Sequence, residues 1–124
     1  MDPTLLKQER QKMHMATDNI RQMIQVIRDR DEKHFVWAWQ QLERNVDAIR
    51  DCFVGETKEQ RKKINDLFDR HAQLFSLQEK LTEKLFKRLT LKDLSDKDIE
   101  TFTKRFIAFI QDVSISFDLA EFEE

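Results

Sequence analysis

Three histidines, one cysteine and many carboxylates are the residues of this chain that could do chemistry. A di-metal site in a helical protein needs Glu-x-x-His pairs on two helices, and Glu-x-x-His does not occur here. His14 and Asp18 stand four residues apart, but nothing implies a further ligand. His71 lies within an apolar stripe, which predicts a core-edge histidine with one hydrogen bond; a ligand or pH-switch role is the alternative. The sequence therefore predicts no metal site.

Catalysis has equally little support. Cys52 stands beside Phe53 near the end of a predicted helix, where the helix dipole disfavours a thiolate. The sequence contains no Gly-rich phosphate loop and no Cys-x-x-Cys pair. We therefore predict that the protein is not an enzyme, with no catalytic residue and no cofactor. The single cysteine also excludes an internal disulfide and favours a reducing, cytoplasmic location.

The composition predicts helices. A chain of 124 residues corresponds to one domain. It contains one Gly and one Pro, which argues against the many tight turns of a sheet protein. The start of the chain lacks the apolar core of a signal peptide, and no apolar run is long enough to cross a membrane. We expect a small helical protein without a membrane segment.

Four apolar stripes with spacings of three and four residues predict four helices. They fall within residues 6–27, 35–53, 57–89 and 95–113. The polar run at 28–34 predicts a break between the first two, and one continuous helix is the alternative. The predicted fold is an all-α, antiparallel up-down bundle of about four helices. Long helical hairpins that pair as a dimer are the alternative fold.

Helix-end signals support these boundaries. Gly55 suits the left-handed position after a helix. Thr57 with Gln60, and Ser95 with Asp98, have the spacing of capping boxes. We divide the chain into one domain (1–113) and an acidic-aromatic C-terminal tail (114–124).

The segment His-Phe-Val-Trp-Ala-Trp-Gln-Gln (34–41) raises the question of binding. Trp37 and Trp39 lie about 200° apart on a helix, so they cannot both face one core. Trp39 belongs to the core stripe, which leaves Trp37 and Val36 as candidate partner-binding residues, since exposed tryptophan is enriched at interfaces. A core face wide enough to bury both is the alternative.

The C-terminal tail supplies further candidate partner-binding residues. They are apolar side chains interleaved with carboxylates, as in a docking peptide: Ile115, Phe117, Leu119 and Phe122. The alternative is a last turn that folds back over the end of the bundle.

Charge is uneven along the chain, although its net value is only −2. Residues 57–92 hold ten basic and five acidic residues, whereas residues 93–124 hold three basic and nine acidic ones. Attraction between neighbouring helices is one explanation. Nucleic-acid contact is a second one, through Lys58, Arg61, Lys62, Lys63, Lys84, Lys87 and Arg88. The aromatic residues fall on core stripes instead of between these basic ones, which disfavours nucleic acid.

The pattern of apolar and polar residues across 16–90 resembles that of flagellar export chaperones. The resemblance is carried by IQVIRDRDEKHFVWAWQQLERNVDAIRDCF followed by KINDLFDRHAQLFSLQEKL. It implies a small helical bundle with an aromatic residue entering the second helix and a long third helix. The turn at 28–34 departs from that pattern, because it lacks a glycine.

These observations predict a non-enzymatic protein-binding module, such as an adaptor, chaperone or inhibitor of a larger assembly, that acts through an apolar helical face. One alternative is a structural protein whose same face forms a homodimer or larger homo-oligomer. A nucleic-acid-binding protein that uses the basic segments is the further alternative.

Overall fold

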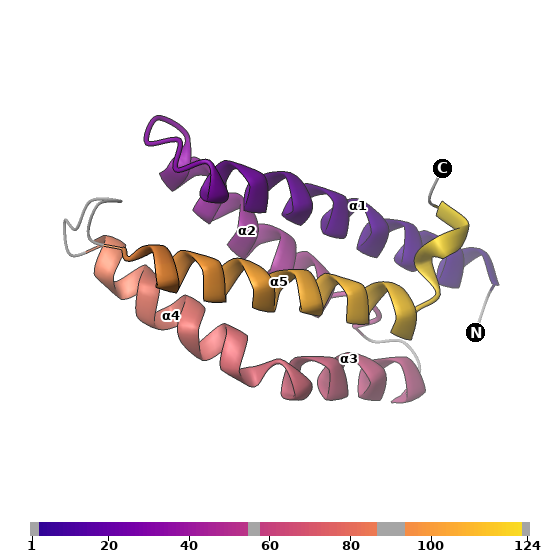
Figure 1. Ribbon diagram of the computed structural model, residues 1–124. Helices are drawn as coiled ribbons and strands as arrows, with labels where there is room; N and C mark the ends of the chain where they lie inside the picture. The colour runs from indigo at the N-terminus through magenta and orange to yellow at the C-terminus, as the bar shows by residue number, and fades with distance from the viewer. Residues whose placement is uncertain (1–2, 55–57, 87–93, 123–124) are drawn as a thin grey trace.

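The structure, a computed structural model, describes residues 3–54, 58–86 and 94–122, apart from the side chains of residues 86, 121 and 122 (Figure 1). Within these ranges it contains five α-helices, one short 3-10 helix and no strand. They are α1 (Pro3–Arg28), α2 (Phe35–Arg50), α3 (Lys58–Arg70), α4 (Ala72–Phe86), α5 (Asp96–Ser116) and the 3-10 helix η2 (Leu119–Phe122). The all-α prediction is confirmed, with one helix more than expected.

The predicted break at 28–34 is confirmed, and the alternative of one continuous helix is wrong. Arg30 adopts a left-handed conformation with φ of 52°, which reverses the chain without a glycine. The Asp31 carboxylate accepts the Lys33 N–H at 3.1 Å and lies 2.7 Å from the His34 ring. These local hydrogen bonds compete with the helix and hold the turn.

The predicted third helix is broken in two, which accounts for the extra helix. The break falls at His71, where no Gly or Pro would predict it. The His71 N–H bonds to the carbonyl of Phe68 at 3.2 Å, three residues back, so the helix tightens locally. The His71 ring is also held by Asp112 of α5 at 2.8 Å. A tertiary contact therefore accompanies the bend between α3 and α4.

Helix α5 joins the two halves of the molecule. It packs against α1, which packs in turn against α2, and against α3 and α4 on its other side. Figure 1 shows α5 between the α1–α2 pair and the α3–α4 pair. The start of α5 is as predicted, because the Ser95 hydroxyl accepts the Asp98 N–H at 3.1 Å.

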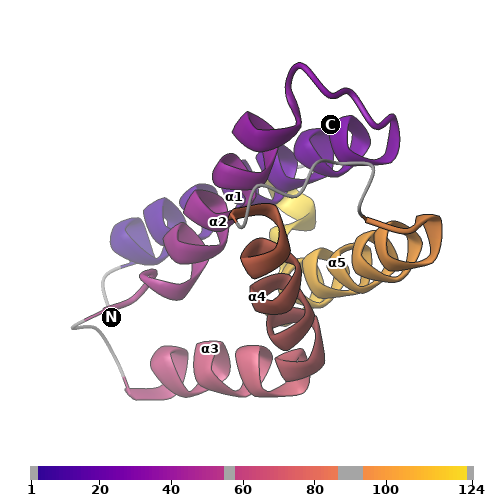
Figure 2. The same cartoon turned by 90° about the vertical axis from the view of Figure 1, so that its left-hand side faces the viewer.

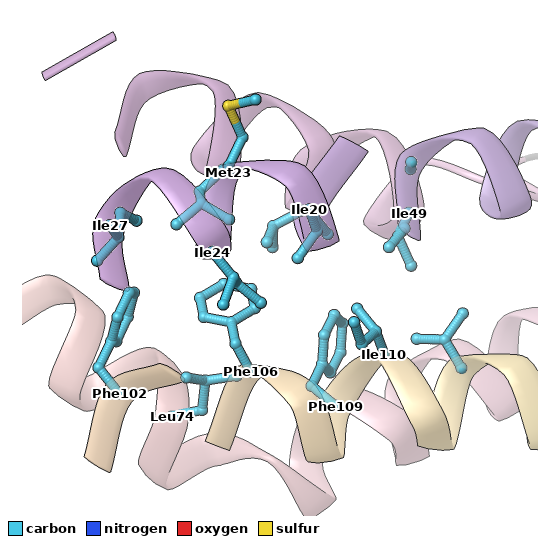
Figure 3. Close-up of a cluster of buried hydrophobic side chains, with 14 of the residues drawn as sticks. Ile20, Met23, Ile24, Ile27, Ile49, Leu74, Phe102, Phe106, Phe109 and Ile110 are labelled. Atoms are coloured by element: carbon cyan, nitrogen blue, oxygen red, sulfur yellow. The ribbon is translucent and has the colours of Figure 1, made fainter. Parts of the chain in front are cut away.

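The core forms where α1 faces α5. Figure 3 shows aliphatic side chains of α1 meeting aromatic side chains of α5, with Leu74 of α4 and Ile49 of α2 at the edges. The labelled residues from the two facing helices are Ile20, Met23, Ile24, Ile27, Phe102, Phe106, Phe109 and Ile110. All are buried, and burying one such side chain stabilises the fold by about 1.5–3 kcal/mol.

Helix α2 ends at Arg50, and the chain turns away from it through a left-handed residue three positions later, Phe53. Its φ is 63° and its side chain is buried. A non-glycine residue there carries a conformational cost, which the burial of the ring offsets. The expected Gly55 and the Thr57 capping position lie outside the described residues.

Candidate functional site

The first turn of α2 carries both buried and exposed apolar side chains. Phe35 and Trp39 are buried, with Trp39 only 3% exposed. Val36 is 58% exposed and Trp37 is 50% exposed. The prediction that Trp39 is buried and Trp37 lies outside the core is therefore confirmed, and the alternative of a core face that buries both is wrong.

Trp39 anchors the helix that presents Trp37. Its indole N–H donates to the Thr82 hydroxyl of α4 at 2.8 Å. Its ring stacks on Phe102 of α5 with centroids 4.7 Å apart and on Phe35 at 5.8 Å. One buried side chain thus ties α2 to α4 and α5, so the first turn of α2 is held rigidly.

The predicted apolar residues of the tail are divided by the structure. Ile115 is exposed at 79%, but Phe117 and Leu119 are buried and do not belong to the surface. The Arg10 Nε–H of α1 donates to the Phe117 carbonyl at 2.9 Å, and the Phe117 ring stacks on Phe53 at 6.0 Å. The tail therefore folds back onto α1, as in the alternative interpretation. The side chain of Phe122 lies outside the described residues.

Ile115, the remaining exposed apolar residue of the tail, lies far from the first turn of α2. Figure 1 shows the C-terminal end of α5, which carries Ile115, at the opposite end of the molecule from the start of α2. The structure thus does not bring Ile115 together with Val36 and Trp37.

The predicted nucleic-acid residues are also separated. The start of α3 and the end of α4 lie at opposite ends of the α3–α4 pair (Figure 1). Lys58, Lys62 and Lys63 are exposed on α3. Lys84 pairs with Asp98 at 4.0 Å, and Lys87 and Arg88 lie outside the described residues.

Arg61 has a structural partner at the end of α2. Its guanidinium donates to the carbonyl oxygens of Arg50 at 2.7 Å and Cys52 at 3.0 Å. Those carbonyls have no partner within their own helix, so a cation there is favourable. Arg61 is therefore not available as a free phosphate contact.

The histidine on the apolar stripe belongs to an ion-pair cluster between the α3–α4 bend and α5. The Asp112 carboxylate accepts from Arg70 Nε at 2.9 Å, from Ser116 at 2.9 Å and lies 2.8 Å from His71 Nε2. Partial burial acts to raise the pKa of Asp112, but hydrogen bonds from Arg70, His71 and Ser116 outweigh it and lower the pKa to about 2. Such a carboxylate stays ionised and suits a structural link.

Cys52 is a buried thiol. Burial raises its pKa to about 12, and the nearby carboxylate of Glu9 acts in the same direction. The thiol donates to the Ala48 carbonyl at 3.2 Å. A thiol with so high a pKa is a poor nucleophile. Among the described residues, no three His, Cys, Asp or Glu side chains gather as a metal site would require.

A groove of about 660 Å³ between α2 and α4 was not anticipated from the sequence. Val46, Phe75 and Gln78 lie deep in it, and charged residues form its walls. The wall residues are Glu43, Asp47 and Arg50 of α2 with Glu79, Thr82 and Glu83 of α4. Figure 2 shows α2 and α4 approaching each other at one end and diverging toward α3. The sequence feature that points to it is the spacing of four residues within each acidic pair, Glu43–Asp47 and Glu79–Glu83.

Comparisons with protein-family models, with characterised proteins and with solved structures found no match to this chain. The resemblance to flagellar export chaperones therefore stays a pattern of the sequence. No helix in the described ranges has the length and apolar character needed to cross a membrane.

Proposed function

We propose that this chain is a non-enzymatic module that binds another protein through apolar side chains on the outer surface of α2. The observation that carries the proposal is the exposure of Trp37 and Val36 on a turn whose other side is fixed in the core. Tryptophan side chains in such positions contribute disproportionately to binding energy. A rigid helix also loses little conformational freedom on binding.

We also infer that the expected antiparallel up-down bundle is the architecture that presents this surface. In this interpretation α3 and α4 together take the place of one bent helix.

The test compares the wild-type chain with Trp37→Asp. The first measurement is molar mass in solution, by size-exclusion chromatography with light scattering. A value near 15.1 kDa leaves the α2 surface free for another protein. Twice that mass, reduced to the monomer value by Trp37→Asp, would favour the homodimer and overturn the proposal.

The second measurement is cross-linking to partner proteins in an extract, with quantitative mass spectrometry. Trp37→Asp should keep the helical circular dichroism signal and lose the proteins that wild type captures. Gln22→Asp adds the same charge at an exposed position of α1 and should capture them normally. Equal capture by both variants, or an unfolded Trp37→Asp chain, would refute the role of Trp37.

A further inference from the structure

We propose that the groove between α2 and α4 binds a basic amphipathic helix of a partner protein. This inference rests on the proposed function, because it assumes a protein partner, and it names the segment that the partner supplies. Four features of the groove support it: its charge, the spacing of its carboxylates, its apolar interior and the glutamine that lines it.

The walls of the groove are strongly acidic. Four carboxylates face one cation, Arg50, which already lies 3.2 Å from Asp47 and 4.6 Å from the centre of the Phe68 ring. Within the described residues, no basic side chain pairs with Glu79 or Glu83. The carboxylates of the walls therefore favour a positively charged occupant, whose approach they also accelerate.

The spacing of the carboxylates matches that of a helix. Glu43 and Asp47 stand four residues apart on α2, and Glu79 and Glu83 stand four residues apart on α4. Four residues of helix rise about 6 Å, so each wall repeats its charge once a turn. A helix along the groove with Lys or Arg four residues apart on both flanks repeats at the same distance and meets both walls.

The interior of the groove suits an apolar stripe. Val46 is buried, and the ring of Phe75 is partly buried against the core. Val36 precedes Glu43 by seven residues, or two turns, so it continues the same face of α2 about 10 Å further along. An occupant helix would therefore contact apolar surface both inside the groove and beyond its end.

The side-chain amide of Gln78 lacks a partner in the part of the chain that the structure describes. The residue is only 8% exposed and lines the groove. A polar side chain of an occupant would satisfy the amide. Gln78 therefore adds a polar side chain to the lining of the groove, beside Val46 and Phe75.

A small polycation is the competing occupant. It would use the carboxylates, but it would leave Val36 unoccupied and make little use of the ring of Phe75. The amphipathic helix accounts for the charged walls, the apolar interior and the extension along α2 together.

The test uses the full chain and a fluorescent synthetic peptide of about 15 residues, a length at which isolated helices begin to form. The peptide carries a Leu stripe flanked by Lys, and a second peptide has Glu in place of Lys. Binding is measured by fluorescence anisotropy. The variant Glu79→Lys/Glu83→Lys reverses one wall of the groove. The control Glu32→Lys/Asp69→Lys makes the same change in net charge at exposed positions outside it.

The Lys peptide should bind wild type and control within about twofold of each other, and bind the Glu79→Lys/Glu83→Lys variant at least about tenfold more weakly. Its affinity should fall as salt is raised. The Glu peptide should not bind. Circular dichroism of both variants should match wild type, because the four substituted side chains are exposed or lie at the rim.

Three outcomes would overturn the inference. One is that Glu79→Lys/Glu83→Lys binds the Lys peptide as well as wild type does. If Trp37→Asp still loses its cross-linked proteins in that case, the proposed function stands and only the groove is refuted. Another is that spermine binds the groove while the peptide does not, which would make the occupant a small cation. The third is a homodimer that dissociates on charge reversal, which would make it a second copy of the chain.

Discussion

Replacing Asp112 with Asn should destabilise the protein in a pH-dependent manner. The substitution keeps the shape of the side chain but removes the charge that holds Arg70 and His71 against α5. Hydrogen bonds from these residues and from Ser116 outweigh the effect of burial and lower the pKa of Asp112 from 3.8 to about 2. At about 1.4 kcal/mol for each pH unit, that difference corresponds to roughly 2.5 kcal/mol. Because the side chain is 25% exposed, solvent screening reduces the expected loss to about 1–2 kcal/mol.

The sign of the pH dependence follows from the lowered pKa. A carboxylate whose pKa is lower in the folded state stabilises the protein fully above its unfolded value, near pH 4. This stabilisation is lost as the pH falls through about 2. The difference between wild type and Asp112→Asn should therefore be constant from neutral pH to about pH 5 and shrink below pH 4.

Urea unfolding followed by circular dichroism, across that pH range, measures the difference. Asp69→Asn is the matched control, because Asp69 is an exposed carboxylate next to Arg70 in the chain. It should change the free energy of unfolding by less than about 0.5 kcal/mol. If the loss in Asp112→Asn were the same at every pH, packing and not charge would explain it. If no loss appeared at neutral pH, the ion-pair cluster would have no role in stability.

Two further predictions concern the indole N–H of Trp39 in α2 and the thiol of Cys52, which follows α2. Thr82→Val should lower the free energy of unfolding by about 1–3 kcal/mol in urea titrations, because the indole N–H of Trp39 loses its acceptor; an unchanged midpoint would contradict this role. The Cys52 thiol, whose pKa burial raises to about 12, should react with a thiol reagent at mildly alkaline pH only as fast as the protein opens. Rapid labelling of the folded chain would show that the thiol is accessible.

The helices and most of their core faces could be predicted from the sequence. Apolar residues spaced three and four apart give an amphipathic helix wherever they meet a common core, so the stripe through Trp39 and Leu42 identified the buried face of α2. The same periodicity left Trp37 outside the stripe. The turn at 28–34 and the helix start at Ser95 could also be predicted from the sequence, because both depend on local hydrogen bonds.

The groove between α2 and α4 could not be predicted from the sequence. Its walls come from two helices that α3 separates in the chain, and the pairs Glu43–Asp47 and Glu79–Glu83 each resemble an ordinary solvated helix face. Only the placement of α2 beside α4 makes their charges face each other.

The sequence by itself determined that this protein is helical, where its first turn falls and which tryptophan is buried, because these features depend on residues close together in the chain. The tertiary structure decided the rest. Asp112 of α5 holds His71 at the bend that divides α3 from α4. Arg10 of α1 holds the tail, so that Phe117 is buried and not presented. Both contacts join residues distant in the chain, and no local pattern encodes which distant partner a side chain will meet.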